Sequence, residues 1–265
     1  MKRLFCILPC LLLFTSFPNA FAQKKVIRPK KGEIVFVSEN IISNKELFEQ
    51  SMKEKQTKLI TLILATMGKE GEIDSLAQKQ AKNLDSVPFM LLTGNDEPMM
   101  FQHVYEDSLI RSYQSSDNGV MIGDYTLIDL KKSTFVLQAK VDRSIIYTKP
   151  QVYYYAKNKE VTITEFRNER KNIHGYDCFK VIYKYKDGSG EENEEEYDEI
   201  STILSLDEFS IAEFWVTDQI QSLFHPICKE KEILAKYFPL EINQKISLFN
   251  GMTISTKLKS ITLSN

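Results

Sequence analysis

Short runs of aromatic and β-branched residues, each followed by a turn signal, fill the middle of this chain. They recur about every ten residues and alternate with signals such as Asp117-Asn118-Gly119 and Lys149-Pro150. This spacing is typical of an antiparallel meander and disfavours alternating βαβ units. The predicted strands of this part are Phe89–Thr93, Met99–Glu106, Leu109–Gln114, Asp124–Asp129, Thr134–Lys140, Ser144–Thr148, Val152–Ala156 and Val161–Phe166.

The second half of the chain continues the same pattern around one strongly alternating segment. In Tyr176–Tyr185, one face carries Phe179, Val181, Tyr183 and Tyr185, which predicts a core strand. The remaining predicted elements are a first strand at Glu33–Ser38, strands at Ile211–Val216 and Gln219–Phe224, a short helix within Cys228–Tyr237, and two last strands, Leu240–Phe249 and Met252–Leu263, that turn at Asn250-Gly251.

Two helices are expected between the first strand and the meander. Ser43 and Glu46 form a capping box, and apolar residues from Phe48 to Met67 follow at helical spacing. A second helix is expected from Glu72 to Asp85, ending before Pro88. Both could form a lid or lie on a membrane surface, or they could pack on the sheet.

The fold class is therefore α+β: one large antiparallel sheet with two amphipathic helices inserted after its first strand. No repeat or low-complexity linker divides residues 32–265, so we expect one antiparallel-sheet domain. The basic segment 23–31 ahead of it is expected to be flexible.

Residues 1–22 have the features of a cleaved signal peptide. Lys2 and Arg3 precede an apolar run that is too short to span a bilayer, and Ala20-Phe21-Ala22 is a small-x-small cleavage pattern. An uncleaved membrane anchor is the alternative. Cleavage after Ala22 would leave 243 of the 265 residues and would place the protein in the periplasm or outside the cell.

The charge balance disfavours a nucleic-acid partner. The formal charge of −2 becomes −4 when Lys2 and Arg3 are removed, so the mature chain has no basic excess that would attract a phosphate backbone. After the signal segment, no stretch is long and apolar enough to predict a transmembrane helix.

Cys178 and Cys228 are the cysteines that would remain after cleavage. An oxidising compartment allows a disulfide between them, and closing a loop of this length would stabilise the fold by on the order of 4 kcal/mol. Two buried free thiols are the alternative.

A catalytic centre is not evident in the sequence. There is no Gly-x-Ser-x-Gly, phosphate loop or His-Glu-x-x-His motif, and no spacing of residues that predicts a metal or cofactor site. The histidines are His103, His174 and His225. A nucleophilic pair of His174 and Cys178 is conceivable, but a disulfide would abolish it. The acidic run at 191–199 is typical of a solvated hairpin rather than of a calcium loop.

One motif resembles a known family. Ile173-His174-Gly175-Tyr176-Asp177-Cys178-Phe179-Lys180 is similar to the signature of the GLPGLI family and the related DUF4412 group, which are exported proteins. Phe214-Trp215-Val216-Thr217-Asp218-Gln219-Ile220 is similar to a second family segment. The eponymous Gly-Leu-Pro-Gly-Leu-Ile is missing from residues 221–238, where Cys228 and a short helix stand instead.

The resemblance implies a fold but no activity. It implies a strongly curved, half-barrel sheet similar to the lipoprotein carriers LolA and LolB, with helices in its concavity. Together with the aromatic residues of the sheet, such as Tyr153-Tyr154-Tyr155, this favours a non-enzymatic protein that binds an apolar, lipid-like or amphipathic ligand in the concavity. The alternative is a structural or interaction module that partners another envelope protein.

Overall fold

The computed structural model describes residues 26–66, 98–116, 118–141, 144–188, 209–245 and 250–265. Four predictions lie outside these residues. They are the signal segment 1–22, the second helix at Glu72–Asp85, the strand at Phe89–Thr93 and the acidic run at 191–199.

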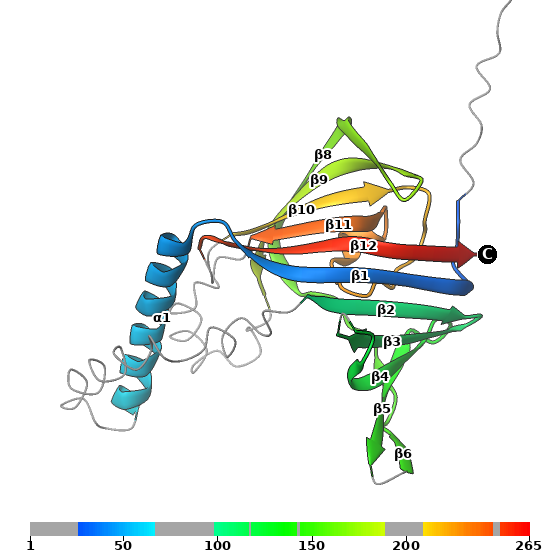
Figure 1. Ribbon diagram of the computed structural model, residues 1–265, viewed down its shortest axis with the longest axis horizontal. Helices are drawn as coiled ribbons and strands as arrows, with labels where there is room; N and C mark the ends of the chain where they lie inside the picture. Colours follow the sequence, from blue (N-terminus) through cyan, green and yellow to red (C-terminus); the bar gives the residue numbers. More distant parts are fainter. Residues whose placement is uncertain (1–25, 67–97, 117, 142–143, 189–208, 246–249) are drawn as a thin grey trace, which may run out of the picture.

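The described chain forms one open antiparallel sheet of 12 strands (Figure 1). Eleven of the strands lie in the order β6-β5-β4-β3-β2-β1-β12-β11-β10-β9-β8, and β7 pairs with β5. Their bounds are β1 Lys31–Ile42, β2 Met99–Glu106, β3 Leu109–Ser115, β4 Met121–Asp129, β5 Thr134–Val141, β6 Ser144–Tyr147, β7 Gln151–Val152, β8 Asn158–Ile173, β9 Tyr176–Asp187, β10 Ser210–Thr217, β11 Phe238–Lys245 and β12 Met252–Ser264. The predicted antiparallel meander is confirmed.

The centre of the sheet is a pairing between the two ends of the chain. β1 pairs antiparallel with β12 from Lys31↔Ser264 to Ile42↔Met252, with one register shift after Val35. Two meanders extend outward from this pair, β2–β6 on one side and β11–β8 on the other. The β1–β12 pair therefore joins two halves that are otherwise each built from neighbours in sequence.

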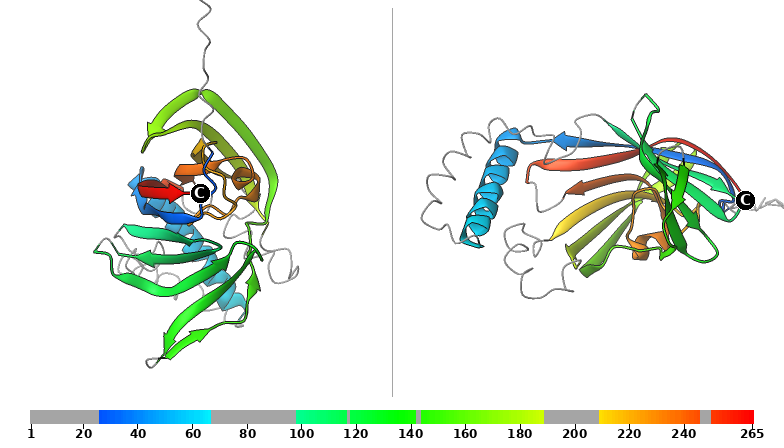
Figure 2. Two further views of the ribbon diagram at one scale, coloured as in Figure 1. Left: turned by 90° about the vertical axis from the view of Figure 1, so that its right-hand side faces the viewer. Right: turned by 90° about the horizontal axis from the view of Figure 1, so that it is seen from below.

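The sheet curves around a concave face that carries the core (Figure 2). On β9, Phe179, Val181, Tyr183 and Tyr185 are all buried, as the alternation predicts. Lys180 and Lys184 lie on the opposite, convex face, over the rings of Phe166 and Phe209. Burial of each large apolar side chain stabilises the fold by about 1.5–3 kcal/mol, so this face sets the register of the strand.

Several predicted elements are shorter than expected. The helix within Cys228–Tyr237 is reduced to α5, Lys231–Leu234, and the strand at Val152–Ala156 to Gln151–Val152. Gln219–Phe224 is not a strand of the sheet. Its apolar residues Ile220 and Phe224 are buried in the core, and Ile220 makes an isolated parallel bridge with Ile27. The apolar pattern therefore reflected contact with the sheet, not membership of it.

The helix after β1 is α1, Lys45–Thr66, and its cap differs from the prediction. The side-chain oxygen of Asn44 accepts the N–H of Leu47 at 3.0 Å, so Asn44 is the N-cap. The Ser43 hydroxyl instead donates to the carbonyl oxygen of Gly251 at 3.0 Å. The start of α1 is thereby tied to the turn between β11 and β12.

α1 does not lie in the concavity. It projects from the end of β1 and β12, as Figures 1 and 2 show. Its buried residues Phe48 and Met52 form a small cluster with Met252 and Ile254. The expectation of helices inside the curved sheet is therefore wrong for this helix.

The part of segment 23–31 that the structure describes makes backbone hydrogen bonds to residues 219–221 and to β12. The N–H of Ile27 donates to the carbonyl oxygen of Gln219 at 2.8 Å. The N–H of Gln221 donates to the carbonyl oxygen of Ile27 at 2.9 Å. The N–H of Lys30 donates to the carbonyl oxygen of Ser264 at 2.8 Å, next to the start of β1.

Gly32 makes the β1–β12 pairing sensitive to substitution. Its φ is +111°, and a Cβ on it would lie 1.6 Å from the carbonyl oxygen of Thr262. We expect Gly32→Ala to destabilise the protein by about 3 kcal/mol or more, because strained backbone and a backbone clash act together. Gly123 is the matched control, since its φ is +71° and no atom lies within 4 Å of the place a Cβ would take. Urea denaturation should show a loss of only about 1–2 kcal/mol for Gly123→Ala; equal losses would contradict the role of Gly32.

Candidate functional site

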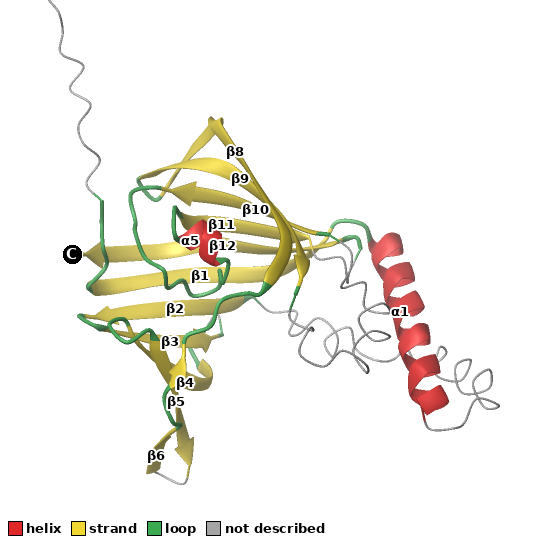
Figure 3. Ribbon diagram, turned by 180° about the vertical axis from the view of Figure 1, so that it is seen from behind, coloured by secondary structure: helices red, strands yellow, loops and turns green. Residues whose placement is uncertain are grey.

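The concave face is covered by the chain itself. Residues Asp218–Tyr237, which we call the insert, cross this face between β10 and β11 (Figures 2 and 3). The buried side chains of the insert share two core clusters with the sheet. They are Ile220, Phe224, Cys228, Ile233, Leu234 and Tyr237. The insert therefore packs on part of the concave face, where the resemblance led us to expect a hollow for a ligand.

His225 fixes the path of the insert. Its ring is fully buried between Phe36 and Phe238, with centroid distances of 4.6 and 4.8 Å. Nδ1 accepts the backbone N–H groups of Ile227 at 3.0 Å and Cys228 at 2.9 Å. Nε2 lies 3.0 Å from the carbonyl oxygen of Pro239. Because Nδ1 accepts two bonds, the proton resides on Nε2, which donates to Pro239.

This environment favours the neutral imidazole. Burial lowers the pKa of His225 to about 3, and the neighbouring positive charge of Lys229 acts in the same direction. His103 on β2 is also buried, and burial holds its pKa well below the ordinary value, with smaller contributions from His225 and Lys229. Neither histidine is placed as a general base near neutral pH, because each is enclosed in the core.

The predicted disulfide is not formed. Cys178 and Cys228 are free, buried thiols, and they lie in different core clusters. Cys178 donates to the carbonyl oxygen of Tyr176 at 3.6 Å, and Cys228 to a carboxylate oxygen of Glu230 at 3.1 Å. Phe179 packs in the cluster of Cys228, and Cys178 precedes it on β9, so Cys178 points to the other face of the strand.

Both thiols are protected from ionisation. Burial raises the pKa of Cys178 to about 12, and burial together with the Glu230 carboxylate raises the pKa of Cys228 well above its ordinary value. His174 lies exposed on the β8–β9 turn, so the conceivable pair of His174 and Cys178 is not assembled as a nucleophile and base.

Lys229 is a feature that its sequence context did not reveal. Its Nζ donates to the Tyr153 hydroxyl at 2.7 Å and lies 4.2 Å from the centroid of the Tyr153 ring. Burial lowers the pKa of Lys229 to about 8. Tyr153 also contacts the Phe224 ring at 4.9 Å. The Tyr153-Tyr154-Tyr155 segment therefore packs against the insert through Tyr153, and Lys229 joins the segment to the insert.

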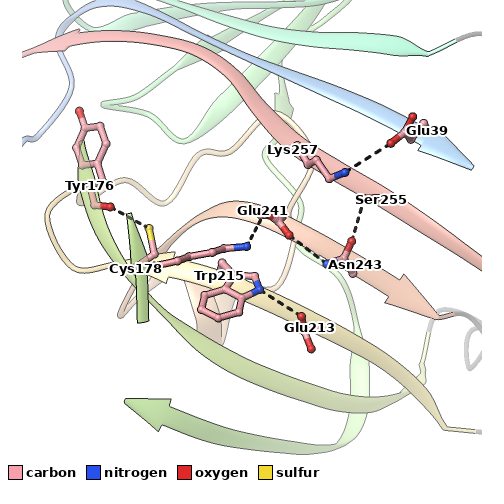
Figure 4. Close-up of polar contacts among 10 residues, drawn as sticks. Glu39, Tyr176, Cys178, Glu213, Trp215, Glu241, Asn243, Ser255 and Lys257 are labelled. Carbon is pink, nitrogen blue, oxygen red and sulfur yellow. Dashed lines mark hydrogen bonds and ion pairs between the residues drawn. The ribbon is translucent and has the colours of Figure 1, made fainter. Parts of the chain in front are cut away.

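The convex face carries a polar ladder around the single tryptophan (Figure 4). Lys171 lies 4.1 Å from the centroid of the Trp215 ring and pairs with Glu241 at 2.7 Å. Trp215 Nε1 donates to Glu213 at 3.2 Å. These contacts link β8, β10 and β11 and satisfy the charges locally, which is the pattern of a solvated sheet face.

Several exposed apolar side chains lie on β5, on β6 and in the segment around β7, at one edge of the sheet. Val152 is 78 % exposed, Tyr154 63 %, and Ile145 and Tyr147 each 55 %. The complete set, which we call the apolar surface, is Leu137, Ile145, Ile146, Tyr147, Val152 and Tyr154. Ile145 and Tyr147 lie on one face of β6 and Ile146 on the other, so the set surrounds the sheet edge. Exposed apolar side chains grouped at an edge are typical of interaction sites.

The opposite edge of the sheet has a different character. β8 is mostly exposed and carries alternating charges, with ion pairs between Lys186 and Glu160 and between Arg170 and Asp177. A register shift between Phe166 and Arg170 adds a bulge, and a groove of 570 Å³ runs along residues 165–169. Charges and a bulge are the usual means of protecting an edge strand from pairing.

Other site classes are not represented in the described part of the chain. Among these residues, no group of three or more His, Cys, Asp and Glu side chains could hold a metal ion. No helix within them has the length and apolar character needed to cross a membrane. Comparison with protein-family models finds no match, and none of the curated proteins matches the sequence.

We expect the two cysteines to be unreactive in the folded protein. With the chain lacking residues 1–22, iodoacetamide at neutral pH should label neither Cys178 nor Cys228, because both are buried and protonated. After unfolding in urea without reductant, mass spectrometry should show both labelled. Labelling that requires a reductant would reveal a disulfide, and labelling of the native protein would reveal an accessible thiolate.

The buried histidines should make the fold sensitive to acid. The pKa of His225 is lowered in the folded state, so below about pH 6.5 the unfolded chain binds a proton that the folded chain does not. Stability is therefore full above that pH and decreases toward about pH 3, by up to about 1.4 kcal/mol per pH unit for each such histidine.

Replacement of His225 tests this origin of acid sensitivity. His225→Phe keeps a ring between Phe36 and Phe238 but leaves two N–H groups and one carbonyl unpaired, so we expect a loss of about 3 kcal/mol at neutral pH. The remaining stability should then change less steeply with pH in urea titrations. His174→Asn, at an exposed position with φ of 49°, is the control and should keep the original slope. An unchanged slope in His225→Phe would contradict the assignment.

Proposed function

We propose that this protein is a non-enzymatic interaction module of the cell envelope, which joins other protein chains through its apolar surface. The observation that carries the proposal is a contrast between the concave face and the β5–β7 edge of the sheet. The insert packs on the concave face, whereas side chains such as Val152 and Tyr154 are exposed at the edge of the sheet. Burying those side chains against a partner would be favourable by about 25 cal/mol per Å² of apolar surface.

The envelope location in this proposal rests on the signal-like segment 1–22 and on the resemblance to the GLPGLI and DUF4412 groups. Both stay predictions, as does the LolA-like comparison of the fold. The signal-like segment and the family resemblance agree in implying an exported protein.

Binding of an apolar or amphipathic ligand in the concavity is the competing prediction. Within the described residues, such a ligand would have to displace the insert, which His225 ties to Pro239 and to its own backbone. The interaction module needs no such rearrangement, since its contact residues are already exposed. This difference is the reason for preferring it.

Photo-crosslinking in cells tests the proposal. Val152 is replaced by benzoylphenylalanine, and Ile211, which is 41 % exposed on β10, is replaced in the same way as a control. We expect a discrete crosslinked protein product from position 152 and none from position 211 after irradiation of intact cells. Mass spectrometry of the product identifies the partner chain.

Two results would contradict the interaction module. One is the absence of crosslinks at position 152, or equal products from both positions. The other is an apolar ligand that stays bound in native mass spectrometry of protein purified from its own envelope, without any protein crosslink. The second result would favour the ligand-binding alternative.

A further inference from the structure

Among the described residues β6 is an edge strand, and its backbone groups that face away from β5 can be assigned. It is the last strand of the sheet order and pairs with β5. The N–H of Thr148 donates to the carbonyl oxygen of Leu137 on β5 at 3.0 Å. Because backbone groups alternate in direction along a strand, Ile146 also faces β5, and the N–H and C=O groups of Ile145 and Tyr147 face the open side.

This edge lacks the protection that the β8 edge has. The β6 sequence Ser144-Ile145-Ile146-Tyr147 contains no charged residue and no proline, and β6 has no bulge in its pairing with β5. The side chains of Ile145, Ile146 and Tyr147 are each more than half exposed, at 55, 51 and 55 %. An uncharged, apolar edge strand is a template for pairing with another extended chain.

The strand is complementary to itself in one antiparallel register. When Ile146 lies opposite Ile146 of a second copy, Ile145 lies opposite the second copy's Tyr147, and Tyr147 opposite its Ile145. The residues with free backbone groups then form two hydrogen-bonded pairs, which gives four main-chain hydrogen bonds. Ile145 and Tyr147 meet on one face of the joined sheet and the two Ile146 side chains meet on the other.

We propose that two copies of this chain pair antiparallel through β6, centred on Ile146, to form one continuous sheet. This inference rests on the proposed function, since it names a second copy as the partner at one edge of the apolar surface. The occupant is a second copy because both the backbone groups and the side chains of β6 match their own two-fold image. A two-fold contact closes on itself and so does not propagate into a fibre.

The mature chain in sedimentation equilibrium tests the pairing. We expect a dimer at micromolar concentrations, and a mass about twofold lower for Ile146→Lys, in which like charges would lie directly opposite one another. Ile146→Asp should be monomeric for the same reason. An equimolar mixture of the two variants should recover the dimer, because Lys and Asp then face each other across the two-fold axis. Ile211→Lys is the control for an exposed apolar residue elsewhere and should stay dimeric.

A cysteine pair tests the register independently of charge. Ile146→Cys should form an intermolecular disulfide on mild oxidation, since opposite residues of a non-hydrogen-bonded pair have Cα atoms about 4.5 Å apart, within disulfide range. Ile145→Cys should not, because its counterpart would be a diagonal neighbour about 7–8 Å away. Far-UV circular dichroism and urea midpoints close to those of the wild type confirm that each variant is folded.

Each contrary result is informative. A monomeric wild-type chain, a dimer unchanged in Ile146→Lys, or folded variants that fail to combine on mixing would overturn the pairing. Crosslinks from position 152 to a different envelope protein, with a monomeric wild-type chain, would overturn this inference while supporting the proposed function. The absence of both would overturn both.

Discussion

The pairing of β1 with β12 is the contact on which the rest of the structure depends. Each of the two meanders has an inner strand, β2 or β11, that is completed by one member of this pair. Gly32 allows the two backbones to approach, because a side chain at that position would occupy the Thr262 carbonyl. The pair also positions the outer features, since the turn that leads into β12 receives the hydroxyl of Ser43 and so fixes the start of α1.

The insert buries apolar side chains on the concave face of the curved sheet, which has few helices in its described part to cover that face. A concave sheet face must be buried, and here a largely irregular segment does this. Irregular backbone inside a core needs hydrogen-bond partners, and the neutral ring of His225 supplies three of them at once. The charge state of one histidine and the path of some twenty residues are thus linked. The hydrogen bond from Lys229 to Tyr153 adds a further contact between the insert and the segment that follows β7.

Much of the sheet could be predicted from the sequence, because alternation and turn signals are local. The bounds of β2 match the prediction, and the burial of Phe179, Val181 and Tyr183 follows directly from their two-residue period. The packing of the insert on the concave face could not be predicted, since the apolar residues of Gln219–Phe224 fit a strand equally well and only the tertiary fold decides. The separation of Cys178 from Cys228 was missed for the same reason, because it depends on where the insert packs. For the apolar surface, the relevant signal was present in Ser144-Ile145-Ile146-Tyr147, an uncharged strand, but its position at an edge is a property of the topology.

The pairing of two strands so distant in sequence at the centre of the sheet has a consequence for the order of folding. A chain that emerges from its N-terminus presents β1 (Lys31–Ile42) long before β12 (Met252–Ser264). Until then β1 has β2 on one side and an open row of backbone groups on the other. Contacts so distant in sequence form slowly, and the waiting edge is prone to wrong pairing. A protein of this topology therefore depends on the rapid appearance of β12 or on a chaperone that shields β1 meanwhile.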